Sequence, residues 1–350
     1  MTFAPEFSTP NAPHNQNIEA LQQLERQLAR EVLAVVEAAS LASGRLMGRG
    51  DCHGADAAAV TAMRRMLDQM AMAGTIVIGE GERDEAPMLY IGEQVGHADR
   101  INNPLELDIA VDPLEGTNLV ANGLPGAVAT LALAPKGGLL HAPDTYMNKL
   151  VVGPRCKGHV SLTAPVAENL DSIARCLHRP VSDLTIVILD RPRHEQLIND
   201  VRQAGARIRL ISDGDLMPAL ATAIEGTGIH AVMGIGGAPE AVLTAAAVKC
   251  LGGEIQAQFC WSNAEQRQRA ERMGVVDTSP EKLYLTQELA PAEAIVFAAC
   301  GITQGDLLKA VHYFGGGART HSVLLGHATG LIRFVDTIHM NQPITTPVHL

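Results

Sequence analysis

The sequence contains few aromatic residues, and it lacks both a long apolar run and the leader of a secreted protein. Aromatic residues make up 3% of the chain against 47% hydrophobic residues in all, so small side chains must provide most of the core. A membrane-spanning helix needs about 20 consecutive apolar residues, and no run approaches that length. The first twenty residues also lack the basic start and apolar core of a signal peptide. We therefore expect a cytoplasmic protein without a membrane partner.

Paired cysteine motifs are also missing. The six cysteines stand at positions 52, 156, 176, 250, 260 and 300, with no CxxC pair and no Cys/His zinc spacing. Free thiols in a reducing compartment are therefore expected. A redox pair of Cys156 and Cys176 stays open, because closeness in sequence says nothing about the spacing or reactivity of two thiols.

Basic residues are in the minority. There are 27 Lys and Arg against 38 Asp and Glu, which gives a formal net charge of −11. Nucleic-acid binding usually depends on a basic surface that displaces counterions from phosphates, so we expect no nucleic-acid partner. A phosphorylated ligand would have to be held locally by a few arginines, backbone amides or metal ions.

The length and element pattern indicate an α/β protein of two domains. At 350 residues the chain exceeds one typical core. Residues 1–16 are rich in Pro, Asn and Thr and predict a flexible tail. An α+β first domain is expected over 17–155, with 320–340 returning to it. From Leu184 strands and helices alternate, which predicts a doubly wound α/β second domain over 156–319 with a mainly parallel sheet.

Within the first domain, apolar spacing predicts helices over 18–46 and 55–72, and a further helix over 85–95 with Pro87 in its first turn. Short apolar runs predict strands at 75–78, 109–111 and 127–133.

The stretch DIAVDPLEGT, residues 108–117, reads as a strand that runs into a sharp acidic turn. Asp112 and Glu115 stand three residues apart at its exit, and Thr117 follows. Two carboxylates and a hydroxyl at one turn suit a hard cation. A solvated acidic cap at an ordinary strand-to-helix turn explains the same residues, and the stretch alone does not separate the two interpretations.

Other acidic residues also stand where elements begin or end, and in α/β enzymes such positions gather in one crevice at the strand ends. Like charges that close together need neutralising cations, so the set predicts two or three Mg²⁺ or Mn²⁺ ions. An alternative is that Asp56 and Glu240 are helix caps. The candidate metal ligands are Asp56, Glu80, Asp112, Glu115 and Glu240.

Seven blocks in order resemble the class II fructose-1,6-bisphosphatases of bacteria: GRGDCHGADAAAVTAMR, TIVIGEGERDEAPMLYIGE, DIAVDPLEGT, APDTYMNKLVVGP, PRH, SDGD and GIGGAPEAV. The resemblance runs from about Gly48 to Asp336. DPLEGT alone resembles the signature of the wider lithium-sensitive, metal-dependent phosphatases. The resemblance implies a sugar-phosphatase fold with a layered α-β-α-β-α architecture. It also implies hydrolysis of the 1-phosphate of fructose 1,6-bisphosphate to fructose 6-phosphate and phosphate, in gluconeogenesis or the Calvin cycle.

By motif position, the resemblance makes the same five carboxylates metal ligands. Thr117 matches the threonine that orients the attacking water, with Glu80 or Asp84 as the proton acceptor. A role for Thr117 as a helix N-cap is an alternative that can coexist with this one.

The resemblance also implies substrate-binding residues. Glu115, Gly116 and Thr117 would surround the reacting phosphate, and Gly237 could cradle phosphate or simply permit close packing. Arginines beside a proline suit bidentate phosphate capture, although two exposed loop charges would look the same. A packed tyrosine ring is likewise an alternative for Tyr146. The residues implied toward the sugar and the far phosphate are Tyr146, Arg191, Pro192, Arg193, Asp213, Gly214 and Asp215.

One position departs from the family pattern. Members usually read GRGDK where this chain reads GRGDC, so Cys52 replaces a lysine expected at the reacting phosphate. A missing ammonium removes a transition-state counter-charge. His53, partly protonated near neutrality, could replace it.

Several functions therefore stay open. The sugar could be sedoheptulose 1,7-bisphosphate, or both bisphosphates could be substrates. A non-catalytic sugar-bisphosphate-binding protein would explain the loss of the lysine, and so would a partner subunit that is active only in a mixed assembly. The resemblance also implies a homodimer or homotetramer.

Overall fold

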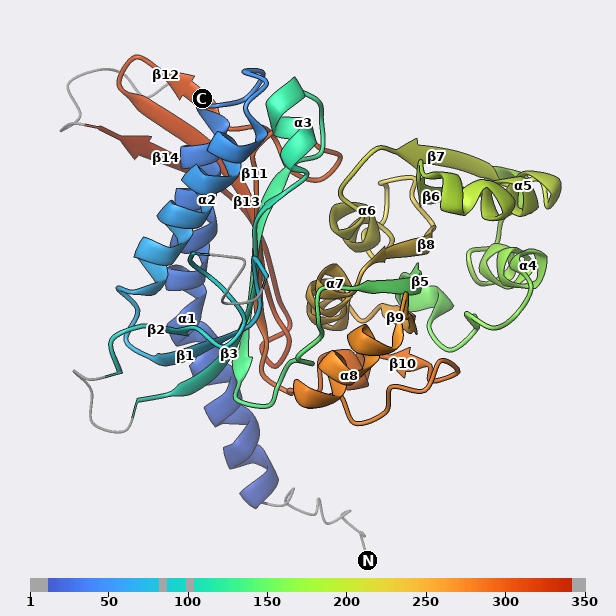
Figure 1. The fold of residues 1–350 in the computed structure, drawn as a ribbon, viewed down its shortest axis with the longest axis horizontal. Coiled ribbons are helices and arrows are strands. Elements are labelled where there is room, and N and C mark those ends of the chain that lie inside the picture. The colour runs from blue at the N-terminus through green and yellow to red at the C-terminus, as the bar shows by residue number, and fades with distance from the viewer. Residues whose placement is uncertain (1–11, 82–86, 99–103, 342–350) are drawn as a thin grey trace, which may run out of the picture.

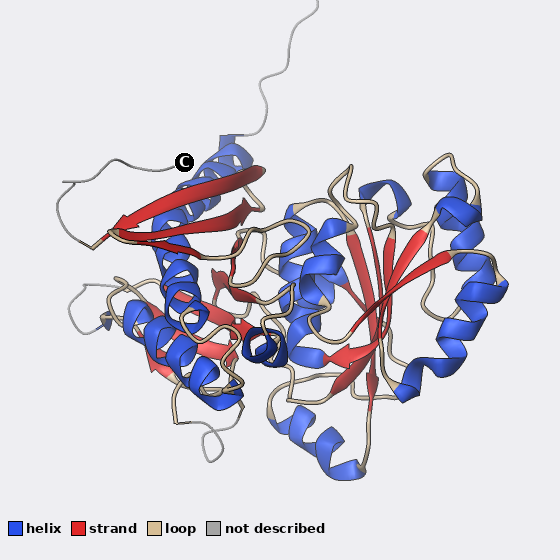
Figure 2. Cartoon of the chain, turned by 90° about the horizontal axis from the view of Figure 1, so that it is seen from above, coloured by secondary structure: helices blue, strands red, loops and turns tan. Residues whose placement is uncertain are grey.

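The computed structural model describes residues 12–81, 87–98 and 104–341. Two β-sheets lie side by side, and helices cover both outer faces and fill the space between them (Figures 1 and 2). The order of layers is helix, sheet, helix, sheet, helix, which agrees with the predicted α/β sugar-phosphatase architecture.

The first sheet has eight strands in the order β12-β13-β11-β4-β3-β1-β2, with β14 paired to β13. Only β1 and β3 run parallel among the pairs described in this sheet. Strand β3 is central and carries the IAV run, buried on both faces. The strands are β1 (Ala73–Ile78), β2 (Gln94–Val95), β3 (Glu106–Glu115), β4 (Val128–Pro135), β11 (Val296–Gly301), β12 (His312–Phe314), β13 (Gly317–Gly326) and β14 (Leu331–Met340).

The second sheet has six strands in the order β10-β9-β5-β8-β6-β7. The pairs β6–β7 and β6–β8 are parallel, whereas β5–β8, β5–β9 and β9–β10 are antiparallel. The sheet is thus mixed, and the prediction of a mainly parallel sheet is wrong, because the strand pairing of β5 is set by segments distant in sequence. The strands are β5 (Tyr146–Val152), β6 (Thr185–Leu189), β7 (Arg207–Ile211), β8 (Ala231–Gly237), β9 (Glu254–Cys260) and β10 (Tyr284–Leu285).

The helices form three layers, two outside the sheets and one between them. Helices α1 and α2 cover the outer face of the first sheet, α4 and α5 that of the second, and α6 and α7 lie between (Figure 1). Helix α9 packs against α7. The helices are α1 (Ala12–Gly44), α2 (Cys52–Leu67), α3 (Thr117–Asn122), α4 (Val166–Cys176), α5 (Glu195–Gln203), α6 (Leu216–Ala221), α7 (Ala238–Cys250), α8 (Ala264–Arg272) and α9 (Thr286–Leu289), with 3₁₀ turns η2 (Pro154–Cys156), η3 (Val181–Asp183) and η4 (Pro192–His194).

Helix α7 is the centre of the middle layer. Its sequence APEAVLTAAAVKC is apolar on all sides, and residues 241–248 are all buried. An all-round apolar helix is expected to lie inside a protein rather than on its surface. It contacts β3, β4, β11 and β13 of one sheet and β5, β8 and β9 of the other, so one helix packs against both sheets.

Some element predictions need correction. The described residues of the predicted 85–95 helix, from Pro87 on, form turns and then β2, because Gly92 takes a φ of +90° and the Glu93 carboxylate accepts the Leu89 amide. Helix α1 begins at Ala12, inside the predicted tail. None of the helices in the described ranges is long and apolar enough to cross a membrane.

Strand pairing bears on the predicted domain limits. Strand β5 pairs in the second sheet although it precedes residue 156, and β11 pairs in the first sheet although it precedes residue 320. The division at those residues stays a prediction. The pairing favours a change of sheet before Tyr146 and a return at Val296.

Candidate active site

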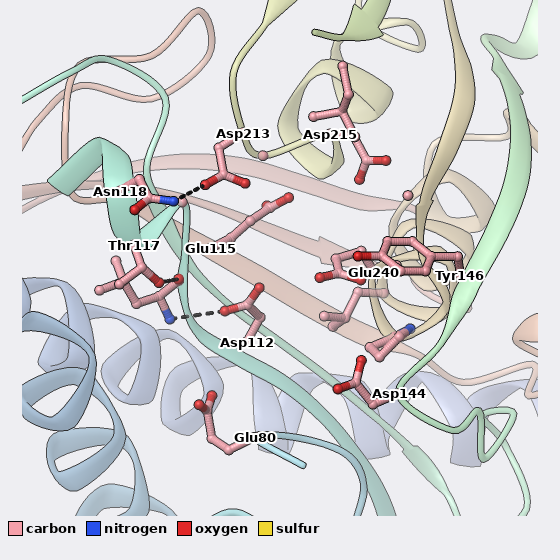
Figure 3. A pocket seen from close by; sticks show the side chains of 18 of the residues that line it. Glu80, Asp112, Glu115, Thr117, Asn118, Asp144, Tyr146, Asp213, Asp215 and Glu240 are labelled. Carbon is pink, nitrogen blue, oxygen red and sulfur yellow. Dashed lines mark hydrogen bonds between the residues drawn. The ribbon is translucent and has the colours of Figure 1, made fainter. Parts of the chain in front are cut away.

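A cavity of about 570 Å³ opens between the two sheets, where β1, β3, β6 and β8 end (Figure 3). Most of the predicted site residues line it, although they come from both halves of the chain. The predicted residues at its wall are Asp56, Glu80, Asp112, Glu115, Gly116, Thr117, Tyr146, Arg191, Arg193, Asp213, Gly214, Asp215, Gly237 and Glu240.

The acidic turn is shaped by an irregularity in the pairing of β3 with β4. The register shifts between Asp112 and Glu115, which re-aims the side chains at the strand end. Asp112 Oδ1 accepts a hydrogen bond from the Leu114 amide at 3.1 Å, and the Thr117 hydroxyl donates to the Leu114 carbonyl at 3.3 Å. The N-cap of α3 is Gly116, with a φ of +87°, so the alternative role of Thr117 as the cap is wrong.

Glu115 links the two sheets. Its side chain is buried, and Oε1 accepts the Leu216 amide at 3.0 Å, at the start of α6. No described residue bonds its other oxygen, Oε2, which is also shielded from solvent. A buried carboxylate oxygen without a partner is costly, so this atom is placed to bind something that the described residues do not supply.

Glu240 shows the same feature at the start of α7. It is the third residue of the helix, and its Oε2 is buried without a described partner. A Cβ at residue 237 would lie 1.8 Å from that oxygen, so only glycine allows the carboxylate this position. Gly237 is the N-cap of α7 and Asp51, not Asp56, is that of α2. The cap interpretation of Asp56 is therefore wrong, whereas Glu240, although not the N-cap, lies in the first turn of α7, where the helix dipole favours an acid.

Burial and mutual repulsion disfavour ionisation of this cluster. Burial, followed by the charge of Asp56, raises the pKa of Glu80 to about 7. Burial is also the main cause of the raised pKa of Asp112, with Glu115 and Glu240 adding repulsion. The pKa values of Glu115 and Glu240 are raised by burial too, while the charge of Lys149 opposes the rise in both.

Unpartnered, mutually repelling carboxylate oxygens are the donor set that hard divalent cations take. The residues present thus fit a metal group distributed along the pocket wall. Within the described residues, however, no three acidic, His or Cys side chains converge tightly enough to form a finished single-ion site. The metal-ligand assignment therefore stays a prediction.

The second sheet contributes the rest of the pocket wall. Tyr146 begins β5 with an exposed ring, and the Arg193 guanidinium lies 5.0 Å above it. Two N–H groups of Arg193 donate to the Ile235 carbonyl, at 3.1 and 2.8 Å. The Tyr146 ring is thus a partly open platform under an arginine, not the packed ring of the alternative.

Beneath this arginine lies His194, which sequence reasoning missed. It is buried, its Nδ1–H donates to the Leu189 carbonyl at 2.7 Å, and its Nε2 accepts the Ile235 amide at 2.7 Å. The ring joins the end of β6 to β8 and so fixes the loop that carries the arginines. Burial lowers the pKa of His194, which favours the neutral ring that these two bonds need.

Lys149 was missed as well. It is buried in β5, and its Nζ lies 2.6 Å from Asp215 Oδ2. The available signal was a single charged residue, a lysine, inside the mostly apolar strand YMNKLVV. Asn118, which donates from Nδ2 to Asp213 Oδ2 at 3.4 Å, and Asp144 also line the pocket without having been predicted.

Three predicted residues are not among those at the pocket wall. Cys52 is the first residue of α2, with Sγ 3.6 Å from Oδ1 of Asn118, which does line the pocket. Pro192 begins η4, between the two arginines. Asp84 falls outside the described residues.

The chain matches one known protein family over most of its length. The sequence model of the family described as bacterial fructose-1,6-bisphosphatase, glpX-encoded, matches residues 26–339. The chain belongs to this family. The resemblance of its motifs to class II fructose-1,6-bisphosphatases, which are phosphoric monoester hydrolases, is thereby confirmed.

Relatives in cyanobacteria span nearly the whole chain, and each is named a D-fructose 1,6-bisphosphatase class 2/sedoheptulose 1,7-bisphosphatase. The protein of Synechococcus sp. (strain JA-3-3Ab) is 49% identical over 339 residues, covering 91% of this chain and 97% of the relative. That of Synechococcus elongatus is 48% identical over 343 residues, covering 92% and 99%. That of Gloeobacter violaceus is 47% identical over 340 residues, covering 91% and 98%.

Proposed function

We propose that this chain hydrolyses the 1-phosphate of fructose 1,6-bisphosphate, giving fructose 6-phosphate and phosphate. One observation carries the proposal: a single pocket brings the buried, unpartnered carboxylate oxygens of Glu115 and Glu240 together with arginines, a tyrosine and two aspartates. The arginines, and cations held by the carboxylates, would bind the two phosphates of a sugar bisphosphate, and the aspartates would bind its hydroxyls. Family membership supports the same reaction.

At the reacting end, Asp56, Glu80, Asp112, Glu115 and Glu240 would hold two or three Mn²⁺ or Mg²⁺ ions. Such ions, when bound, supply positive charge that activates water and steadies the leaving oxygen. The metal dependence that the family resemblance implies supports this, as do the buried, partnerless oxygens of Glu115 and Glu240.

Protein groups then place the water and take its proton. The Thr117 hydroxyl lies at the wall beside Glu115 and would orient the attacking water toward phosphorus. Glu80, at the same pocket wall, would accept the proton. Asp84 remains the alternative acceptor.

At the sugar end, Asp213 and Asp215 would accept hydrogen bonds from sugar hydroxyls, and Tyr146 would support the sugar face. Arg191 and Arg193 would hold the far phosphate. Arg193 is already held by the Ile235 carbonyl, so less side-chain freedom is lost when a ligand binds.

Sedoheptulose 1,7-bisphosphate is the second candidate substrate. The dual names of the cyanobacterial relatives favour it, and the exposed Tyr146 ring leaves the sugar end open. A non-catalytic binding protein, suggested by Cys52, is less well supported because every predicted carboxylate that the structure describes lines the pocket.

We also propose a cytoplasmic homodimer or homotetramer that acts in gluconeogenesis or the Calvin cycle, on the family resemblance alone. The mass of the purified protein measured by light scattering tests the assembly. A monomeric mass at micromolar concentration would contradict it.

A phosphate-release assay tests the reaction. The protein is incubated with each bisphosphate and Mn²⁺, Mg²⁺ or a chelator, and kcat/KM is compared between the two sugars. We expect release with at least one metal and none with chelator. Tight binding of the bisphosphate with no release under any condition would instead support the binding protein.

A further inference from the structure

Lys149 is a buried cation that none of the roles above uses. Its side chain is only 2% exposed, in the middle of β5, where it faces Gly234 of β8 and Ala257 of β9 in the strand register. Removing an ammonium from water is costly unless it gains a close charged partner. An interaction of the buried Lys149 must therefore offset the free-energy cost of desolvating its ammonium.

The partner is Asp215, one of the two aspartates at the sugar end. Lys149 Nζ lies 2.6 Å from Asp215 Oδ2, and both side chains are buried. Gly236 makes room for this contact: a Cβ there would lie 2.7 Å from Nζ and 2.4 Å from Oδ2. Three elements of the second sheet and its connections thus meet at one ion pair.

The same ion pair reaches the metal end through the backbone. Leu216 follows Asp215 directly, and its amide donates to Glu115 Oε1 at 3.0 Å. By fixing the Asp215 side chain, Lys149 therefore also fixes the Leu216 amide, which orients Glu115. The connection runs from β5 in the second sheet, through residues 215–216, to the end of β3 in the first sheet.

We propose that Lys149 is a positioning residue for the hydrolysis: it orients Asp215 toward the sugar and, through the Leu216 amide, keeps Glu115 aligned with the reacting phosphate. This inference rests on the proposed function. It predicts that Lys149 acts through Asp215, so the two residues depend on each other energetically.

A double-mutant cycle on kcat/KM measures that dependence. Lys149→Met keeps the length of the side chain and removes its charge. We expect a loss of about 100-fold, because a buried carboxylate is left without its partner. In an Asp215→Asn background the same substitution should cost at least about tenfold less, because only the charge of Lys149 toward Glu115 and Glu240 is then lost.

A second variant tests the contact without removing the lysine. Gly236→Ala places a methyl group between the two charges, so we expect it to lower kcat/KM in the same direction while the Asp215→Asn background again suppresses its effect. If Lys149→Met does not fold, Gly236→Ala still tests the contact.

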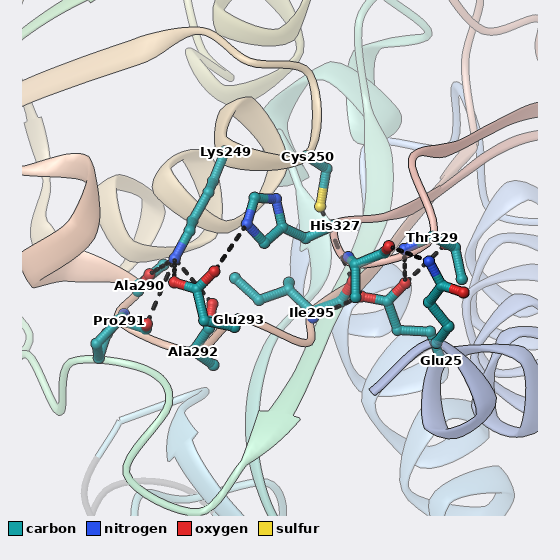
Figure 4. A network of polar contacts seen from close by, with 12 residues as sticks. Glu25, Lys249, Cys250, Ala290, Pro291, Ala292, Glu293, Ile295, His327 and Thr329 are labelled. Carbon is teal, nitrogen blue, oxygen red and sulfur yellow. Dashed lines mark hydrogen bonds and ion pairs between the residues drawn. The ribbon is translucent and has the colours of Figure 1, made fainter. Parts of the chain in front are cut away.

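The chain offers a matched control in Lys249, a second little-exposed lysine far from the pocket wall. Its Nζ donates to the carbonyls of Ala290, Pro291 and Ala292 and pairs with Glu293 (Figure 4). Lys249→Met should lower the melting temperature and leave kcat/KM within about twofold, since it removes a buried lysine without touching the site.

Independent losses in the cycle, or an unchanged kcat/KM in Lys149→Met, would overturn the positioning role. If the parent protein released no phosphate, the proposed function would fail. The same cycle measured by calorimetric binding of fructose 6-phosphate would still decide on Lys149, because coupling between Lys149 and Asp215 would appear in the affinity.

Discussion

Cys52 stands where the family resemblance leads us to expect a lysine. It is the first residue of α2, and its thiol contacts Asn118, which in turn lines the pocket and bonds Asp213. Asn118 lies at the pocket wall, so a longer basic side chain at position 52 is expected to bring its charge closer to the cavity than the thiol does.

Cys52→Lys should therefore raise kcat for phosphate release by about tenfold, since each well-placed donor to a developing charge contributes at least that much. Cys52→Met, of similar length and without charge, is the control and should give no gain. A lower rate in Cys52→Lys would mean that the site is built around Cys52, with Asn118 as its partner. Steady-state kinetics with saturating Mn²⁺ measures the difference.

Much of the site could be predicted from single residues, because Asp112, Glu115 and Thr117 stand at a turn whose chemistry is local. Lys149 and His194 could not, since their roles depend on Asp215 and Ile235, which only folding brings near. Asn118 shows the same limit, because its partner Asp213 is 95 positions away in sequence.

Among the elements, the 3₁₀ turn η4 depends on one neutral histidine. His194 donates to Leu189 and accepts from Ile235, and burial lowers its pKa from the ordinary value of about 6.5. A lowered folded-state pKa means that the ring stabilises the fold above the unfolded-state pKa. That contribution is lost as pH falls through the folded-state value.

His194→Gln should thus cost about 1–3 kcal/mol at pH 8 and less at pH 5. It should also raise KM more than it lowers kcat, because Arg193 loses its support. Urea unfolding at both pH values measures the first effect. His159→Gln, at an exposed position, is the control. An equal cost at both pH values would show that protonation of His194 does not matter to η4.

The sequence predicted the strands and helices from residue 184 to 250 well, since alternating apolar runs are local signals. It did not predict their directions, because β5 enters the second sheet antiparallel to β8. It also failed at residues 87–95, where the buried Glu93 and its ion pair with Arg64 hold the chain in turns.

For the molecule as a whole, the acidic pocket predicts an unusual response to pH and metal. The pKa of Glu80 is raised to about 7, above its unfolded value. A raised folded-state pKa stabilises the metal-free protein below the unfolded value, and this contribution is lost as pH rises through 7.

In chelator, the melting temperature should therefore fall between pH 6 and pH 8, and Mn²⁺ should restore it most at pH 8, where the carboxylates are ionised. Thermal unfolding followed by fluorescence measures both. In chelator, Glu80→Gln should make the melting temperature depend less on pH. The absence of any gain with Mn²⁺ at pH 8 would contradict metal binding at this site.

Helix α7 gives the molecule one further property. Because its buried small residues pack against both sheets at once, neither sheet can lose its partner without exposing the same apolar surface. The two halves should then melt together, in one calorimetric transition with equal van't Hoff and measured enthalpies. Two separate transitions would show that the halves fold independently. If there is a single transition, a destabilising substitution far from the pocket, in either half, would lower the fraction of molecules with an intact pocket as much as an equally destabilising one beside it.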